Sequence, residues 1–584
     1  MIISPSRRRA AAALLGALGA VVTSARAQAP LDIVPVAPSE PAPPAVEPVS
    51  PGEPVEVGKA AAPDPEAAGA IDAAAGGFPF AMWQGTPRPL VEALLPRLPA
   101  ETTSAAVRAL VRRLLASAAA PPEGRAGTSL LALRAERLAA MGDGGAVNAL
   151  LRALPPGFED RRIWRVRLDS LLLAADTVNA CALAKDLVAR DDDPYWEETL
   201  IFCQALKGGH AKAALGLSLL RERGAAVDDG FVALLAAMRD GEAADLSRLA
   251  RPNALEVAML KAARVPIPAF AAETAGPAAA RAFALAATVA PEIRVRAAER
   301  AEALGTLPAT ALAEVYDGIA FPPEELARPL SRAESDRSPL ARALLHQAAA
   351  AQTVPAARAE VIRVALGHAA KATGFTGFAT AARLYAGMIA GLPVSPELAW
   401  FAGDAARALY AVDRPDAARA WLSLADEQAS VDASAADAVA RLWPIARLAD
   451  DSVAWDDDRL AAWWAAHEKD PALARESKAV RLFALLEAAG ATVSAERLVG
   501  LIGDAPLAWS RTLAAVLAER LEAAAREGRL GETVLLAAVG FADDTGQPSP
   551  LALTMAVAAL GRVGLRAEAR RLAVEAALAA DFGG

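Results

Sequence analysis

The sequence contains few of the residues that most often carry out chemistry in proteins. Its 584 residues include two cysteines and four histidines. Two cysteines are too few for the disulfide framework of a small secreted domain or for a four-cysteine zinc site. The histidines belong to no H-E-x-x-H or Cys/His motif, and they are His210, His346, His368 and His467. We therefore predict no bound metal.

Catalytic and nucleotide-binding motifs are also missing. There is no G-x-S-x-G elbow, no phosphate-binding loop and no G-x-G-x-x-G fingerprint in the sequence. The glycine-rich run 142–145 joins two expected helices, so a turn is its simplest interpretation. We predict no catalytic residue and no cofactor, and we expect a protein that is not an enzyme.

Aromatic residues and strand-like runs are scarce, whereas alanine is abundant. Apolar residues make up 54% of the chain but aromatic residues only 5%. No run alternates polar residues with β-branched or aromatic ones, as a half-buried strand does. Alanine is the strongest helix former, and its small side chain lets helices approach one another closely. These features predict an all-α fold.

Long apolar runs without charge occur only at the N-terminus. Arg7–Arg9 precede the apolar segment Ala10–Ser24, and Ala25–Ala27 has the A-x-A form of a cleavage site. Residues 1–27 are therefore predicted to be a signal peptide, cleaved after Ala27, and the arginine run leaves the twin-arginine export route open. We expect a periplasmic or secreted protein with no membrane span in the mature chain.

Basic residues are outnumbered by acidic ones. The net charge is −9, and cleavage after Ala27 removes four arginines and no acids, which changes it to −13. An exported acidic chain offers no basic surface for nucleic acid, so we exclude nucleic acid as a partner.

Residues 28–77 are rich in proline and alanine and show no helical period, which predicts a disordered linker. It could act as a spacer from the envelope or simply be an unstructured N-terminus. Two helical-repeat regions, 78–325 and 326–584, should follow, with a soft boundary near 325–337 where prolines cluster. The second region includes separate helices expected at 355–371 and 376–391.

The clearest helical pattern lies between residues 160 and 224. In its first segment Trp164, Leu168 and Leu171 occur at i, i+4 and i+7, which is the apolar stripe of an amphipathic helix. Short links separate the segments, so consecutive helices should pack antiparallel. The four segments are Asp160–Leu173, Val178–Arg190, Tyr195–Leu206 and His210–Arg223.

The helical hairpins recur at a regular spacing. They start at about residues 128, 160, 193 and 228, about 32 to 35 residues apart, as in two-helix repeats. A single hairpin cannot bury its apolar face alone, so neighbouring hairpins should stack into an α-solenoid.

The last hairpin resembles a tetratricopeptide repeat. In that family a turn glycine is followed five residues later by a small residue at the helix crossing, and a further alanine lies seven residues beyond. Gly564, Ala569 and Ala576 have this spacing. The resemblance implies a superhelix that binds a protein or peptide on its concave face. Two further hairpins share the spacing in part: Asp413, Ala418 and Ala425, and Gly209 and Ala214 with Arg221 in the last position.

The irregular superhelix of soluble lytic transglycosylases is the alternative. That family has a Glu-Ser pair followed by a small-residue motif. Glu334-Ser335 and Glu476-Ser477 supply the pair without the motif. The alternative function is therefore a peptidoglycan-associated enzyme or enzyme subunit.

Two residue pairs are candidate functional features. Cys181 and Cys203 lie eleven residues on either side of Asp192, so a chain reversal there would bring them within disulfide reach, although two buried thiols are also possible. Trp463 and Trp464 are adjacent on a helix and point about 100° apart, so one of them could line a partner groove. Packing between hairpins is the other interpretation. We expect an exported, non-catalytic scaffold that binds a protein or peptide in the cell envelope, with a partner that the sequence does not identify.

Overall fold

A computed structural model describes residues 64–154, 157–240, 246, 249, 251–491, 513–541 and 549–581. Within these ranges the chain is all-α, as predicted, and its only β pairing consists of two isolated bridges. The predicted signal peptide, the linker up to residue 63 and a helix expected at 494–503 lie outside the described residues. None of the described helices combines the length and apolar character needed to cross a bilayer.

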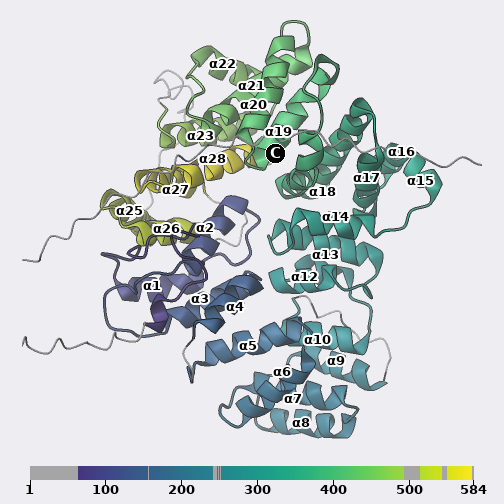
Figure 1. Ribbon diagram of the computed structural model, residues 1–584, viewed down its shortest axis with the longest axis vertical. Helices are drawn as coiled ribbons and strands as arrows, with labels where there is room; N and C mark the ends of the chain where they lie inside the picture. Colours follow the sequence, from purple (N-terminus) through teal and green to yellow (C-terminus); the bar gives the residue numbers. More distant parts are fainter. Residues whose placement is uncertain are drawn as a thin grey trace, which may run out of the picture. The chain divides into compact units, whose positions relative to one another are not determined.

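The helices follow one another from Pro65 to Ala580 (Figure 1). They are η1 (Pro65–Ala67), α1 (Arg88–Leu94), η2 (Leu95–Arg97), α2 (Ala105–Ala116), α3 (Leu130–Ala140), α4 (Gly144–Arg152), α5 (Arg161–Leu173), α6 (Thr177–Val188), α7 (Pro194–Leu206), α8 (His210–Glu222), α9 (Asp229–Asp240), α10 (Ala254–Ala263), α11 (Ala269–Thr274), α12 (Pro277–Ala284), α13 (Pro291–Ala303), α14 (Ala309–Asp317), α15 (Pro323–Ala327), α16 (Pro329–Ser335), α17 (Pro339–Ala351), α18 (Pro355–Ala390), η3 (Pro396–Phe401), α19 (Ala402–Ala411), α20 (Pro415–Gln428), α21 (Ala433–Ala449), α22 (Asp457–Ala466), α23 (Ala472–Ala488), α25 (Leu513–Arg526), α26 (Leu530–Val539), α27 (Pro550–Arg562) and α28 (Arg566–Ala580).

Consecutive helices pack as pairs, as the repeat spacing predicts. Contacts join α3 to α4, α5 to α6, α7 to α8, and α9 to α10. The first helices of these pairs start at Leu130, Arg161, Pro194 and Asp229, within two residues of the expected starts. The apolar period therefore predicted both the hairpins and their positions.

Eight of the turns between consecutive described helices share one geometry. A residue with positive φ ends the first helix, and the N–H of the next residue donates to a carbonyl five positions earlier, as Leu565 does to Leu560 over 2.9 Å. This Schellman-type turn satisfies carbonyls that the helix end leaves free. In six of these turns the fifth residue after the positive-φ residue is buried, in the pairs Gly142 and Val147, Ala175 and Ala180, Gly208 and Ala213, Asp413 and Ala418, Gly528 and Thr533, and Gly564 and Ala569. After Gly224 and Gly305 the fifth residue is exposed.

One of the predicted turn registers is wrong by a residue. In the α7–α8 turn the positive φ of 76° belongs to Gly208, whereas Gly209 has a φ of −83°. The buried crossing residue is accordingly Ala213, and Ala214 is exposed. Gly208 and Gly209 are adjacent, and either glycine could adopt the positive φ of the turn. The sequence alone therefore did not determine the register.

The apolar core forms two clusters, which change over between Val166 and Leu168 and again between Ile319 and Ala333, whereas the sequence suggested a single soft boundary near 325–337. One apolar cluster runs from Leu168 to Ile319 and includes Ala343, and the other combines residues 78–166 with residues 333–578. The first four helices therefore share their core with the C-terminal region, although they are far from it in the sequence.

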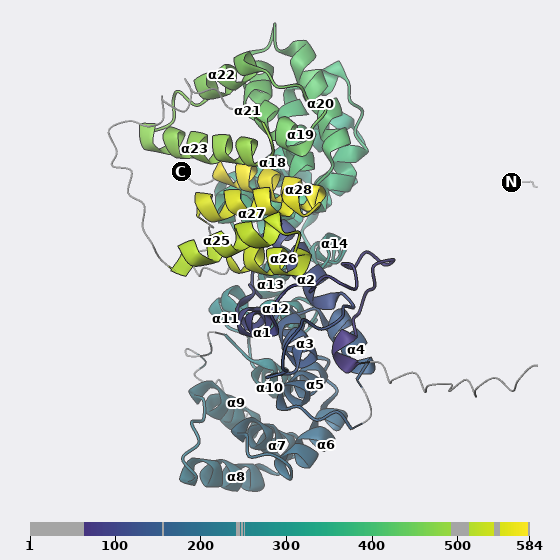
Figure 2. The same cartoon turned by 90° about the vertical axis from the view of Figure 1, so that its left-hand side faces the viewer.

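The first helices also contact the last ones. Helices α1 and α2 pack against α26, and α2 packs against α28 as well (Figures 1 and 2). The Arg113 guanidinium lies 2.7 Å from the Glu568 carboxylate, and the Gly531 N–H donates to the Met82 carbonyl over 2.9 Å. Each hairpin was expected to contact only its neighbours, whereas here the first described helices also pack against the last described ones.

The described chain begins at Asp64, and residues 64–77, which fall in the predicted linker 28–77, make specific contacts with the first helices. The Glu66 carboxylate accepts two hydrogen bonds from Arg88, at 2.6 and 2.9 Å. The buried Arg134 guanidinium donates to the carbonyls of Ala68, Leu115 and Ser117, each over 2.7 Å. These contacts are made by individual polar side chains and not by a repeating apolar stripe. A search for helical periodicity therefore could not predict them.

Candidate functional site

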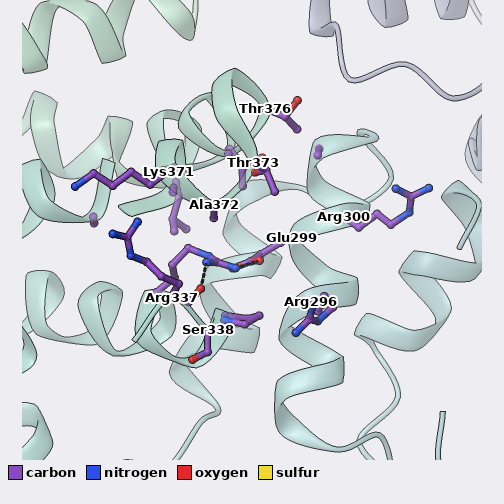
Figure 3. Close-up of a pocket in the computed structure, with 18 of the residues that line it drawn as sticks. Arg296, Glu299, Arg300, Arg337, Ser338, Lys371, Ala372, Thr373 and Thr376 are labelled. Atoms are coloured by element: carbon purple, nitrogen blue, oxygen red, sulfur yellow. Dashed lines mark hydrogen bonds and ion pairs between the residues drawn. The ribbon is translucent and has the colours of Figure 1, made fainter. Parts of the chain in front are cut away.

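A cavity of about 630 Å³ lies among α13, α14, α17 and α18 (Figure 3). Its size falls within the range of about 300–1,000 Å³ that is usual for small-molecule pockets. Helix α17 begins at Pro339, immediately after Arg337 and Ser338. These two residues line the cavity together with Arg342, which lies in the first turn of α17.

A break in α18 forms one wall of the cavity. Thr373 and Gly374 have non-helical backbone angles, and the φ of 61° at Gly374 is one that glycine adopts without strain. The sequence predicted this division as separate helices at 355–371 and 376–391. The break places Lys371, Thr373 and Thr376 at the cavity (Figure 3).

Glu299 organises the opposite wall. Its carboxylate accepts hydrogen bonds from Arg342 over 2.6 and 2.7 Å and from the Tyr316 hydroxyl over 2.7 Å. Burial lowers the pKa of Arg342, but the Glu299 carboxylate outweighs burial and raises it overall. Burial raises the pKa of Tyr316 well above its usual value, so its hydroxyl remains a donor. These three side chains are therefore fixed and mutually satisfied.

Positive charge dominates the cavity lining, although the whole chain is acidic. Its five cationic side chains face two carboxylates, those of Glu273 and Glu299. Three of the five cations are held by the protein, because Arg296 pairs with Glu273, Arg300 lies 3.7 Å from Glu101, and Arg342 binds Glu299. The other two are Arg337 and Lys371, and both are exposed.

A second, larger hollow of about 1,420 Å³ is lined by α2, α3, α4, α5, α10 and α12. The glycine-rich turn 142–145 lies on its rim, so that turn both joins two helices and shapes a surface. Both signs of charge line this groove, for example Arg162 and Arg281 beside Glu136 and Asp143.

The two predicted cysteines are bonded to each other in the structure. Cys181 lies on α6 and Cys203 on α7, with Cα atoms 5.8 Å apart. The turn between these helices lies around Asp192, where the sequence predicted the chain reversal.

The two predicted tryptophans differ in exposure. Trp463 is 5% exposed, and its ring packs against His467 and Phe483. Trp464 is half-buried, with the Arg475 guanidinium 4.6 Å from its ring centre. Only Trp464 therefore presents surface, and its contact with a partner stays a prediction.

None of the four histidines lines either hollow, although His346 packs against Tyr316 and Tyr385, which line the smaller cavity. His346, His368 and His467 are at most 4% exposed, on α17, α18 and directly after α22. Burial lowers the pKa of His346 and of His368, which favours neutral rings. Across the described residues no group of three potential ligand side chains is placed to hold a metal ion.

Comparison with protein-family models, with curated proteins and with solved structures gives no match to this chain. The geometry of the two hollows therefore carries the functional argument. Sequence reasoning identified neither Arg337 nor Lys371 as a site residue. The only sequence signal for them is the Thr-Gly break after Lys371 within a long helical pattern.

Proposed function

We propose that the protein is a non-catalytic helical-repeat scaffold of the cell envelope that binds a peptide segment of a partner protein in the large groove. The volume of the groove supports this proposal. At about 1,420 Å³ it exceeds the range of about 300–1,000 Å³ that suits small molecules. Stacked helical hairpins use extended surfaces of this kind for binding.

The lining of the groove suits a polypeptide backbone. Alanine and glycine occupy much of it, including Ala105 and Ala109 on α2 and Gly144 and Gly145 at the start of α4. Such short side chains leave room for a main chain to approach. The exposed Asn148 amide offers both a donor and an acceptor, which matches the hydrogen-bonding groups of a peptide.

Filling the groove should abolish binding. A Cβ atom added at Gly144 meets no atom within 4 Å, and the position requires no positive φ, so we expect Gly144→Trp to fold normally and to place a large ring at the lining of the groove. We expect a photo-cross-linker at Asn148 to capture a partner in living cells, and Gly144→Trp to reduce the yield at least about tenfold, since a lost anchor contact costs about 1.4 kcal/mol or more.

Gly387 provides the matched control, because it is exposed, also has free space around its α-carbon and lies outside both hollows. Gly387→Trp should leave the cross-link intact. Equal yields from cross-linkers at 148 and 387 would contradict the proposal. Binding to purified sacculi in place of a protein cross-link would favour the peptidoglycan alternative.

The proposal includes export and oxidation. The signal-like residues 1–27 and the bonded cysteine pair support it together, because disulfides persist in oxidising compartments. We expect protein isolated from the envelope fraction to begin at Gln28, and non-reducing peptide mapping to link Cys181 to Cys203. Chain produced in the cytosol without residues 1–27 serves as the reduced control. Retention of residue 1, or two free thiols in the envelope sample, would count against this part.

We also propose that the hairpins are tetratricopeptide-like in design. The shared turn supports this idea, because a positive-φ residue followed five positions later by a buried residue recurs in six hairpins within the described ranges. Two of the three turns that carry the resemblance, at Asp413 and Gly564, have this geometry in the predicted register.

A further inference from the structure

Several hydrogen-bond donors that line the cavity at the α18 break have no acceptor within the described part of the protein. Arg337, Lys371, Thr373 and Thr376 line it, and none has a hydrogen-bond or ion-pair partner within the described part of the chain. Their neighbours Arg342, Glu299 and Tyr316, by contrast, satisfy one another. The second half of α18 starts at the break, so the positive end of its dipole adds to the same region.

Tyr385 supplies an independent observation from the buried part of the same lining. It is 2% exposed and lines the cavity, yet its hydroxyl has no hydrogen-bond partner among the described residues. Burial raises its pKa, so the hydroxyl stays protonated and remains a donor. The hydroxyl oxygen is not among the fully buried unpartnered atoms, so it is accessible from the cavity, where it can donate to a bound acceptor.

The rest of the wall is apolar. Ala365, Ala369 and Leu384 line the cavity between these donors, with Ala303 and Leu304 contributed by the end of α13. A free inorganic ion would leave these surfaces uncovered. A ligand with a hydrocarbon body would cover them and gain about 25 cal/mol for each Å² removed from water.

We propose that this cavity binds a small organic oxyanion, a carboxylate or phosphate monoester with an apolar body. Lys371 and Arg337 hold the charged oxygens at one side of the cavity, opposite Arg296 and Arg300 (Figure 3). Thr373 and Thr376 lie away from the charged ends of Lys371 and Arg337 (Figure 3), so these two cations hold the head group, and the Tyr385 hydroxyl donates to an acceptor at the buried end. This site is distinct from the peptide groove, so the proposal does not depend on the function proposed for that groove.

Four probes separate the contributions of charge and apolar body. Calorimetric titration of the full mature chain would compare hexanoate, hexyl phosphate, hexanol and inorganic phosphate. We expect the two amphiphilic anions to bind more tightly than hexanol or inorganic phosphate. The tighter of the two then distinguishes a carboxylate head group from a phosphate. Failure of every probe to bind at millimolar concentration would overturn the proposal.

Substitutions test the assigned donors. Lys371→Gln and Arg337→Gln should each weaken binding of the better anion about tenfold or more, because hydrogen bonds to charged groups contribute about 1.5–3 kcal/mol. Tyr385→Phe should weaken it several-fold. Lys371 and Arg337 are exposed, so their replacement should leave the circular dichroism spectrum and melting temperature unchanged.

Lys212→Gln is the matched control, since Lys212 is an exposed lysine on α8 outside both hollows. It should bind the probes like the unmodified chain. If Lys212→Gln weakened binding as much as Lys371→Gln, or if the Lys371 and Arg337 variants kept full affinity, the assignment would be wrong. Loss of the partner cross-link at Asn148 with intact anion binding would remove the proposed function and leave this site in place.

Discussion

Replacing Arg383 with alanine should lower the free energy of unfolding by about 3–5 kcal/mol, because it leaves a buried carboxylate without its partner. The Arg383 guanidinium on α18 binds both oxygens of Glu302 on α13, at 2.5 and 2.8 Å. The Glu302 side chain is only 3% exposed. Once Arg383 is removed, the Glu302 carboxylate loses both hydrogen bonds and, among the described residues, keeps only Arg108 as a nearby compensating charge.

The position of this pair explains why its loss should be felt widely. Arg108 on α2 lies close enough to interact with Arg383, Glu302 and Glu575, and it donates to the Ala303 carbonyl over 3.0 Å. Glu575 on α28 in turn accepts the Ala106 N–H over 3.0 Å. The Arg383–Glu302 pair thus lies where α2, α13, α18 and α28 meet, and weakening it should loosen the contact between the first and last helices.

Denaturant unfolding followed by tryptophan fluorescence would measure the loss, and hydrogen exchange would show faster opening of α13 and α18. Arg363→Ala is the matched control, because Arg363 lies on the same helix but pairs with an exposed Glu360. Such surface pairs contribute about 0–1 kcal/mol. The double variant Arg383→Met with Glu302→Met should recover part of the loss, since apolar replacement removes both charges. If Arg383→Ala were as stable as Arg363→Ala, the Arg383–Glu302 pair would not have the structural role assigned to it.

The structural features that depend on local apolar periodicity could be predicted from the sequence. The hairpins at Arg161 and Pro194, the reversal near Asp192 and the division of the long helix before residue 376 all follow from apolar spacing and turn residues within about forty positions. Within such a window the helical period fixes which faces can meet, so the proximity of the cysteine pair could also be derived.

Contacts between distant segments could not be predicted in this way. Ala106 and Glu575 are 469 residues apart, and no periodic pattern states that their helices touch. The cavity at the α18 break could not be predicted for the same reason, because Arg337 and Lys371 come from separate elements and each resembles an ordinary surface cation in sequence. Trp463 shows the converse, since adjacency to Trp464 suggested exposure but tertiary packing buried it.

A cluster of acidic side chains where α7, α9 and α10 meet should make stability fall as the pH rises. Burial raises the pKa of Glu256 from 4.5 to about 7, with further contributions from Asp228 and Glu198. Burial likewise raises the pKa of Glu198 to about 7. The Glu256 side chain nevertheless has a structural task, because it caps α10 by accepting the Asn253 N–H over 2.8 Å. The helix start therefore retains a carboxyl group that resists ionisation.

Glu256→Gln should abolish this part of the pH dependence. Between about pH 4.5 and 7 the unfolded chain has lost the Glu256 proton while the folded chain retains it, so the free energy of unfolding decreases as the pH rises through this window. The difference between a pKa of 4.5 and one of about 7 corresponds to about 3 kcal/mol, which is present below pH 4.5 and lost above pH 7. Glutamine keeps the capping bond, because its carbonyl accepts the Asn253 N–H and its amide donates to Asp228 as a protonated carboxyl would.

The variant and the unmodified chain should therefore be equally stable near pH 5, and the variant should be more stable by about 2 kcal/mol at pH 8. Chemical unfolding at a series of pH values would measure this difference. Glu222→Gln is the matched control, because Glu222 is exposed at the end of α8, and its curve should run parallel to that of the unmodified chain. A constant difference between the Glu256→Gln and unmodified curves from pH 5 to pH 8 would show that Glu256 is ionised throughout. In that case its carboxylate would hold the start of α10 as a charged cap.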